Sequence, residues 1–169
     1  MKILAISGSA SVESSNVLLL EAIQRKFSND YEIEVYQNLR NLPLFKPEDL
    51  DNIIPTDIRA LREKVVKANA IIISTPEYTH NIPAVLKNAF EWMTGSGELV
   101  EKQVLAITFT PHKPRGEHAM KSLLFTLKAM NTRVVTQVSL HKTDVTIEKG
   151  RLELGDEVSF MLDEAMKLL

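Results

Sequence analysis

The sequence predicts one α/β domain built on an open, five-stranded parallel sheet with helices on both faces. Short β-branched or aliphatic runs alternate along the chain with longer stretches whose apolar residues recur at helical spacing. The 169 residues are 44% hydrophobic and 25% charged, which is enough for one well-buried core. No repeat, low-complexity tract or linker divides them. Because crossovers between parallel strands are right-handed, five such units give an open sheet, and we expect a single domain over residues 1–169.

The predicted strands differ in how deeply they should lie in the sheet. Residues 31–36 alternate polar with apolar side chains, which is typical of an edge strand. Residues 70–75 instead begin with four consecutive aliphatic side chains and suit a central strand covered on both faces. The remaining strands are predicted at residues 2–7, 103–108 and 133–138.

The predicted helices follow the strands at the spacing of parallel βα units. A helix at residues 83–94 has Pro83 in its first turn, where proline is tolerated, and Gly95 as its stop. The segment 38–57 contains three prolines and is predicted to be an ordered loop. The other helices are predicted at residues 14–27, 57–68, 117–130 and 156–169.

Composition and charge exclude several classes of function. A formal net charge of -2 and a pI near 6.1 give no basic surface for nucleic acid. The apolar runs are strand-length, far short of the roughly 20 residues of a membrane-spanning helix, and no signal peptide is apparent. With no cysteine, the chain has no disulfide, thiolate metal cluster or cysteine nucleophile. We therefore expect a cytoplasmic protein without nucleic-acid or membrane partners.

The first candidate site is the turn after the first strand. Ligands of open parallel sheets bind outside the carboxyl ends of the strands. Here Gly8 is followed, just before a helix, by side chains that carry neutral donors. Together with free backbone N–H groups at the helix start, they form a credible phosphate cradle. The alternative is that Ser14 or Ser15 caps the helix and the rest is a polar turn. The donors are Ser9, Ser11, Ser14, Ser15 and Asn16.

Other phosphate loops and a hydrolase motif are excluded by spacing. The turn has no Gly-Lys-Ser/Thr ending, as P-loop hydrolases have, and no third glycine, as the dinucleotide fingerprint requires. Position 11 is Ser rather than Gly, which excludes a Gly-x-Ser-x-Gly nucleophile elbow around Ser9.

Two segments together resemble the NADPH-dependent FMN reductase family, which includes quinone, chromate and azo-dye reductases. Residues 8–16 are similar to the family's phosphate loop. Residues 75–92 resemble its Pro-Glu-Tyr-Asn stretch, with the later Pro, Leu-Lys-Asn-Ala and Trp also in place. The resemblance covers about two-thirds of the chain. One departure concerns charge, since family members commonly carry Arg where this chain has Ser11.

This resemblance implies a flavodoxin-like fold with strand order 2-1-3-4-5 and FMN as the cofactor. NADPH or NADH would be the co-substrate, and a quinone, azo compound, nitro compound or metal oxyanion would accept the electrons. Because the flavin carries the chemistry, we expect no catalytic acid, base, nucleophile or metal from the protein. Members are commonly homodimers or homotetramers.

The resemblance also implies which further residues bind the cofactor. The Pro-flanked loop of residues 76–81 would present backbone N–H groups to the flavin ring, with Tyr78 packed against it. Thr79 stands where many members have Asn, and His80 is either a proton donor or a solvated loop residue. Thr110 fits the pattern of the loop after the fourth strand. The added cofactor-binding residues are Pro76, Glu77, Tyr78, Thr79, His80, Asn81 and Thr110.

Two questions stay open at the level of sequence. His112, Lys113 and Arg115 form a cationic cluster that either meets the phosphates of a nicotinamide cofactor or an anionic substrate, or is simply solvated. The same fold also serves flavodoxin-type electron carriers and non-catalytic flavin-binding regulators. A net charge of only -2 and a single Trp argue against an electron carrier.

Overall fold

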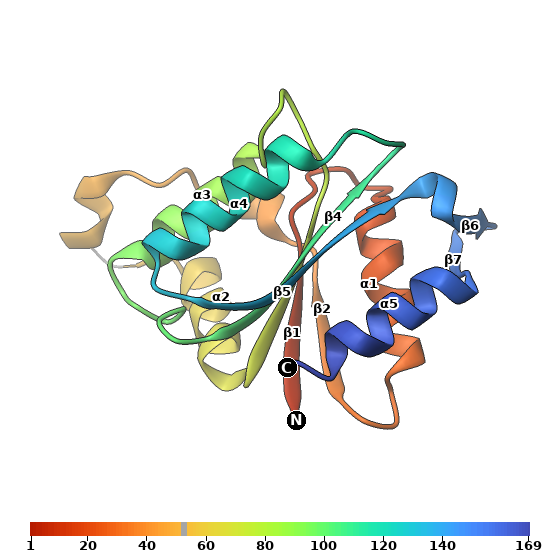
Figure 1. The fold of residues 1–169 in the computed structure, drawn as a ribbon. Helices are drawn as coiled ribbons and strands as arrows, with labels where there is room; N and C mark the ends of the chain where they lie inside the picture. Colours follow the sequence, from red (N-terminus) through yellow and green to blue (C-terminus); the bar gives the residue numbers. More distant parts are fainter. Residues whose placement is uncertain (52–53) are drawn as a thin grey trace.

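Five parallel strands form one twisted sheet in the computed structural model, which describes residues 1–51 and 54–169 (Figure 1). The strand order is β2-β1-β3-β4-β5, which confirms the predicted flavodoxin-like topology. The strands are β1 (Lys2–Ser7), β2 (Glu32–Tyr36), β3 (Ala70–Thr75), β4 (Gln103–Thr110) and β5 (Arg133–His141). The helices are α1 (Ser15–Lys26), α2 (Thr56–Lys67), α3 (Ala84–Thr94), α4 (Glu117–Ala129) and α5 (Asp156–Met166).

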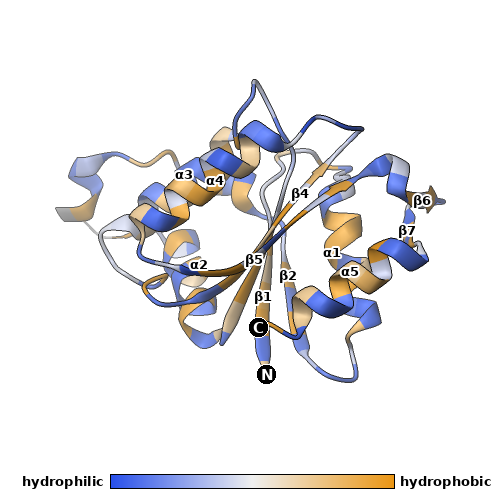
Figure 2. Ribbon diagram, viewed as in Figure 1, coloured by the Kyte–Doolittle hydropathy of each residue, from blue (hydrophilic) through white to orange (hydrophobic). Residues whose placement is uncertain are grey.

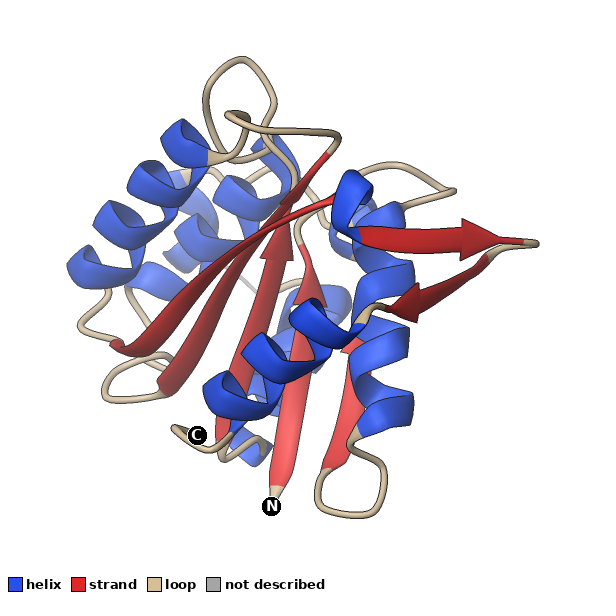
Figure 3. Ribbon diagram, turned by 45° about the vertical axis from the view of Figure 1, so that its right-hand side comes forward, coloured by secondary structure: helices blue, strands red, loops and turns tan. Residues whose placement is uncertain are grey.

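The helices divide between the two faces of the sheet, as Figures 1 and 3 show. α2, α3 and α4 cover one face, and α1 and α5 cover the other. Successive side chains of a strand point to opposite faces, so β3 sends Ile71 and Ile73 into the first core and Ala70 and Ile72 into the second. Apolar residues concentrate on the sheet and on the helix sides that face it (Figure 2).

The structure extends the strand predictions in two places. β4 and β5 continue past the predicted ends at residues 108 and 138, to Thr110 and His141. A hairpin of β6 (Val145–Glu148) and β7 (Arg151–Leu154) was not predicted, and it projects beside α1 and α5 (Figure 3). Leu152 of this hairpin is buried in the core on that side. None of the described helices has the length and apolarity that crossing a bilayer demands.

The segment predicted as an ordered loop contains two short 3-10 turns, η1 (Leu39–Asn41) and η2 (Pro47–Asp51). Residues 52 and 53 of that prediction lie outside the described residues. α3 holds the middle of the segment, because the Asn88 amide accepts a hydrogen bond from the Phe45 N–H at 2.8 Å and donates one to the Pro43 carbonyl at 2.9 Å. Trp92 Nε1 donates to the same carbonyl. These α3 side chains stabilise the fold rather than a ligand.

Gly8 brings the loop after β1 close to the rest of the sheet edge. A Cβ at this position would lie 2.8 Å from Leu86 Cδ2 and 2.9 Å from Thr75 Oγ1, so only glycine fits there. Its N–H donates to the Ser74 carbonyl at 2.8 Å. The loops that follow β1 and β3 are therefore packed against each other where the strands end, opposite the chain termini in Figure 1.

Candidate functional site

A cavity of about 210 Å³ lies at the carboxyl edge of the sheet, between the start of α1 and the loops after β3, β4 and β5. Its walls come from segments far apart in sequence, as expected for a ligand site of an open parallel sheet. The lining residues are Ser9, Ser11, Glu13, Ser14, Ser15, Asn16, Pro76, Glu77, Tyr78, Phe109, Pro111, Arg115 and Lys142.

Most of the predicted cofactor-binding residues meet at this cavity. Ser9, Ser11, Ser14, Ser15, Asn16, Pro76, Glu77 and Tyr78 line it. Thr79, His80, Asn81 and Thr110 do not. The first loop and the start of the second therefore share one site.

α1 begins at the cavity without a capping side chain. Ser14 is its N-cap residue but makes no side-chain capping bond, and no acidic residue lies in the first turn. Ser14 Oγ is buried and has no hydrogen-bond partner among the described residues. Among the described residues, Arg62 Nε is the only other buried side-chain nitrogen or oxygen without a hydrogen-bond partner, and it lies 3.5 Å from a Glu98 carboxylate oxygen. The first N–H groups of a helix have no partner within it, so this end of α1 offers unpaired donors to an anion.

Asn16 fixes the start of α1 to the sheet. Its Oδ1 accepts a hydrogen bond from Ser74 Oγ at 2.7 Å, and its Nδ2 donates to the Phe109 carbonyl at 3.3 Å. Because its amide is engaged within the protein, Asn16 positions the helix and can offer a ligand its backbone N–H. Within the preceding turn, Ser9 Oγ accepts from the Ser11 N–H at 3.2 Å.

Glu77 is a buried carboxylate that caps α4. Its Oε2 accepts hydrogen bonds from the N–H groups of Gly116 (3.1 Å), His118 (3.0 Å) and Ala119 (3.1 Å). Burial alone would raise the pKa of this carboxyl, but the hydrogen bonds from Ala119, Gly116 and His118 outweigh it and hold the pKa below its ordinary value. Glu77 therefore stays ionised and fastens the loop after β3 to the start of α4.

The loop after β3 folds into a tight turn. Tyr78 and Asn81 exchange backbone hydrogen bonds of 2.9 Å in each direction, and the two residues between them have positive φ, 52° for Thr79 and 55° for His80. Positive φ at both central positions is the type I′ pattern, which favours Asn-Gly and strains a β-branched residue. The turn leaves Tyr78 46% exposed on the cavity wall.

The far side of this turn contacts α4 rather than the cavity. The Asn81 carbonyl oxygen Oδ1 accepts hydrogen bonds from the Ile82 N–H and from the Ser122 hydroxyl. The exposed His80 ring lies edge-on to that of His118, with centroids 4.6 Å apart, and its Nδ1 is 3.4 Å from Glu77 Oε1. His80 and Asn81 thus reinforce the attachment that Glu77 makes.

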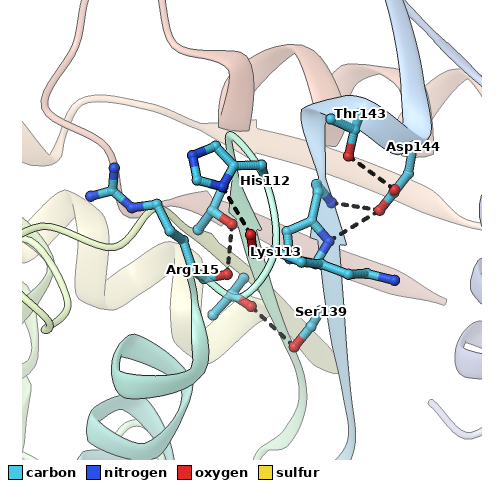
Figure 4. Close-up of polar contacts among 9 residues, drawn as sticks. His112, Lys113, Arg115, Ser139, Thr143 and Asp144 are labelled. Atoms are coloured by element: carbon cyan, nitrogen blue, oxygen red, sulfur yellow. Dashed lines mark hydrogen bonds and ion pairs between the residues drawn. The ribbon is translucent and has the colours of Figure 1, made fainter.

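The loop after β4 is closed by its own hydrogen bonds. The buried Thr110 hydroxyl donates to the Arg115 carbonyl at 2.8 Å, and the Arg115 N–H donates to the His112 carbonyl at 3.1 Å. His112 Nδ1 lies 2.9 Å from the Lys113 carbonyl oxygen. Figure 4 shows that the Arg115 guanidinium extends away from these contacts. Thr110 shapes the loop, and Arg115 lines the cavity while His112 and Lys113 do not.

A short turn after β5 completes the wall. In η3 (Lys142–Asp144), Asp144 Oδ2 accepts from the His141 N–H at 2.9 Å and lies 3.2 Å from its ring Nδ1, while Oδ1 accepts from the Thr143 hydroxyl (Figure 4). Burial would raise the pKa of the Asp144 carboxyl, but these bonds hold it below its ordinary value. These contacts of Asp144 with His141 and Thr143 fix the backbone that carries Lys142.

A larger hollow, of about 580 Å³, lies beside α4 and the β5 edge, with Leu124, Lys128 and Val134 among its lining residues. No buried side-chain polar atom of its lining lacks a partner within the described part of the chain. The smaller cavity has the unpaired donor and the convergent loops, so we take it as the functional site.

Five of the lining residues are not among the cofactor-binding residues predicted from the sequence. Glu13 lies inside the first loop but was not predicted to bind a phosphate, because its carboxylate has no hydrogen-bond donor. Phe109 is the last residue but one of β4, and Pro111 and Arg115 lie in the loop that follows it. Arg115 was predicted only as part of a cationic cluster that either meets an anion of a cofactor or substrate or is solvated. Lys142 was out of reach because β5 was predicted to end at residue 138. A longer predicted β5 would have brought Lys142 to the same edge as Arg115.

Known proteins match the chain both in sequence and in fold. The family model described as NADPH-dependent FMN reductase matches residues 1–144. The chain is 42% identical over 108 residues to the NADH:(hydroxy)cinnamate reductase subunit CrdA of Vibrio ruber, covering 63% of this chain and 52% of that protein. It is 38% identical over 96 residues to the NADH-dependent flavin reductase subunit 2 of Lactobacillus johnsonii, covering 57% and 50%.

Among solved structures, the fold matches FerB, a flavoenzyme NAD(P)H:(acceptor) oxidoreductase from Paracoccus denitrificans. The TM-score is 0.81 at 19% sequence identity, and the match covers 99% of this chain and 94% of that one. At this identity the likeness shows the fold. The matched regions correspond to about half the length of the curated relatives above.

Proposed function

Because the chain belongs to the NADPH-dependent FMN reductase family, we propose that it binds FMN in the cavity at the start of α1 and passes reducing equivalents from NADH or NADPH to a small electron acceptor. The acceptor classes are those expected from the sequence, namely quinones, azo compounds, nitro compounds and metal oxyanions. The relatives named above for hydroxycinnamate and flavin reduction support an organic acceptor.

The single observation that carries this proposal is the buried Ser14 hydroxyl at an uncapped helix N-terminus, which has no hydrogen-bond partner among residues 1–51 and 54–169. Leaving a polar atom buried without a partner is costly, and a phosphate oxygen would satisfy it. The residues fit FMN in a second respect. Tyr78 lines the same cavity, and nearly half of its surface is exposed there, where a planar ring would pack against it. Phosphate and ring contacts are thus available on neighbouring walls.

When bound, FMN supplies the hydride chemistry, and this chain supplies binding and orientation. The start of α1 holds the phosphate end, with Asn16 keeping the helix against β3 and β4. Glu77 and Asn81 fasten the loop that carries Tyr78 to α4, so that the ring contact is held in place. No residue is required to move a proton in this scheme, in line with the absence of a predicted catalytic side chain.

Cofactor binding and reduction test the proposal in two steps. Purified protein is incubated with FMN and desalted, and the retained flavin is measured by its visible absorbance. The loaded protein is then mixed with NADH or NADPH in a stopped-flow instrument. Retained flavin that bleaches rapidly, followed by reoxidation with a quinone, supports the reductase. Protein that retains no flavin would refute the cofactor assignment.

A second candidate is electron delivery to a partner protein. Both of the curated relatives described above are named as subunits, which favours this alternative. The same stopped-flow experiment separates the two functions. The reduced flavin of a small-molecule reductase is reoxidised rapidly by a quinone. The flavin of a dedicated carrier stays reduced when the quinone is added and is reoxidised by its protein acceptor.

We also propose a homodimer or homotetramer and a cytoplasmic location. The first rests on the resemblance to the family, and multi-angle light scattering of the FMN-loaded protein tests it. The second rests on the absence of cysteine from the 169 residues, since secreted domains more often use disulfides. Fractionation of the producing cells tests the location.

A further inference from the structure

The first loop of the proposed FMN site carries no positive charge. Residues 8–16 contain no Lys or Arg, and with Ser11 they offer the cavity neutral donors and one carboxylate, Glu13. A phosphate monoester carries a charge of about -1.5 to -2 near pH 7. Two cationic side chains nevertheless line the cavity, Arg115 from the loop after β4 and Lys142 from the turn after β5.

The backbone of Arg115 is held on both sides while its side chain stays available. Its carbonyl accepts from Thr110, its N–H donates to His112, and the next residue, Gly116, donates to the buried Glu77 carboxylate. Its guanidinium has no hydrogen bond or ion pair with any described residue, and the side chain is exposed. Figure 4 shows it extended beyond the closed loop.

Lys142 is presented in the same way from the neighbouring strand. β4 and β5 are in register so that Thr110 pairs with His141, which places η3 beside the loop that carries Arg115. The contacts of the Asp144 carboxylate with the His141 N–H and ring fix this turn. The Lys142 ammonium has no partner within residues 1–51 and 54–169, and it is exposed. Both cations are therefore unpaired groups on fixed backbones.

The two carboxylates that line the cavity, Glu77 and Glu13, differ in how far they offset the positive charges of Arg115 and Lys142. Glu77 already accepts three N–H groups of α4 and is 5% exposed. Glu13 is exposed and directly precedes the N-cap of α1, where its charge opposes an anion. The net effect on a phosphate at Ser14 depends on Arg115 and Lys142 outweighing Glu13.

We propose that Arg115 and Lys142 together bind the phosphate of FMN, replacing the cation that the first loop lacks at Ser11. This inference rests on the proposed function and assigns Arg115, one of the three cations of the loop after β4, to the flavin rather than to the nicotinamide cofactor. Arg115 contributes its planar, multiply donating guanidinium and Lys142 a point charge.

Titration of the flavin-free protein with FMN and with riboflavin tests the proposal, since riboflavin lacks only the phosphate. Arg115→Gln and Lys142→Gln should each weaken FMN binding about tenfold, a typical loss for a charged hydrogen bond, and leave riboflavin affinity within about twofold. Lys121→Gln, which removes an exposed charge of α4 that does not line the cavity, is the matched control and should change neither affinity.

Two further variants probe the charge itself. Glu13→Gln should tighten FMN binding severalfold. Ser11→Arg should restore FMN affinity to the Arg115→Gln, Lys142→Gln double variant, a rescue that a purely structural role of the two cations would not produce. Raising the ionic strength should weaken FMN binding of the wild type more than that of the double variant.

The outcomes are distinguishable. FMN-selective loss with rescue supports the inference. Equal losses for FMN and riboflavin, or unchanged FMN affinity with a raised KM for NADPH, would overturn it while leaving the reductase intact. A wild-type protein that binds neither flavin would overturn both the inference and the proposed function. Thermal unfolding of each variant verifies that it is folded.

Discussion

The helices α1 and α4 begin at the same edge of the sheet, and they differ in whether a side chain of the protein caps the N-terminus. At α4, the Glu77 carboxylate accepts three backbone N–H groups, so the helix end is occupied by an anion of the protein itself. At α1, no side chain caps the helix, and the buried Ser14 hydroxyl is unpaired within the described part of the chain. Both ends have the same intrinsic attraction for negative charge.

The difference separates a structural attachment from a binding site. The α4 terminus holds the loop of Tyr78 in place, and its Gly116, His118 and Ala119 N–H groups are already engaged by Glu77. The α1 terminus keeps its donors and carries a stability cost that a bound phosphate would offset. A helix N-terminus at a sheet edge is thus informative only after its partners within the protein are known.

The largest effect should follow removal of the internal anion. Glu77→Ala leaves three N–H groups at the start of α4 unpaired, two of them on buried residues, and should lower the free energy of unfolding by about 2–4 kcal/mol. Glu77→Gln keeps an acceptor and should lose less. Urea denaturation measures both. If Glu77→Ala is as stable as the wild type, the attachment described above is wrong.

Removal of the unpaired hydroxyl should have the opposite signature. Ser14→Ala deletes an atom that has no hydrogen-bond partner among the described residues, so the free energy of unfolding should change by less than about 0.5 kcal/mol, although alanine at an ordinary N-cap costs about 1 kcal/mol. FMN affinity should fall about tenfold. Isothermal titration and urea denaturation of the same preparation check the two halves. A stability loss without an affinity loss would make Ser14 a cap.

A change in the turn between the two helix ends should stabilise the protein without changing FMN binding. Thr79→Asn with His80→Gly supplies the residues that a type I′ turn prefers, and the relief of positive φ should raise the free energy of unfolding by about 1 kcal/mol. FMN affinity should stay unchanged, because neither side chain lines the cavity. Decreased stability would indicate that the His80 contacts with His118 and Glu77 outweigh the backbone strain.

The smallest expected effect is in the acid range. The pKa of Glu77 is lowered in the folded state, so its charge stabilises the fold above the ordinary value of 4.5, and this contribution is lost as pH falls through the lower folded value. The stability difference between wild type and Glu77→Gln should therefore shrink as pH falls below 4.5. Asp144, whose pKa is also lowered, is present in both proteins and drops out of the difference. A constant difference would contradict the assignment.

The fold was predictable because the signals that determine it are local. Runs such as Ile71 to Ile73 show a covered strand directly, and the helical spacing between runs gives parallel units. The hairpin at residues 145–154 was missed because its strands are four residues each and only Leu152 is fully buried, so its pattern is too short to stand out. β5 was predicted too short for a related reason, since it is an edge strand with a mixed pattern of exposure.

Several residues that line the candidate cavity were predictable from the sequence, but their hydrogen-bond partners were not. Sequence placed Ser14, Asn16 and Glu77 near a ligand, and the structure brings all three to the cavity. That Asn16 is engaged with Ser74 and Phe109, and Glu77 with α4, depends on partners tens of residues away. Hydrogen-bond partners across such separations leave no local pattern in a single sequence.

The most direct test of this account compares the two helix ends within one sample. Backbone amide signals of the flavin-free protein are followed by ¹⁵N–¹H NMR during titration with inorganic phosphate. We expect the signals of Ser15 and Asn16 to shift saturably, while those of His118 and Ala119 stay in place, because Glu77 already occupies their donors. Saturable shifts at His118 and Ala119 without shifts at Ser15 and Asn16 would contradict it.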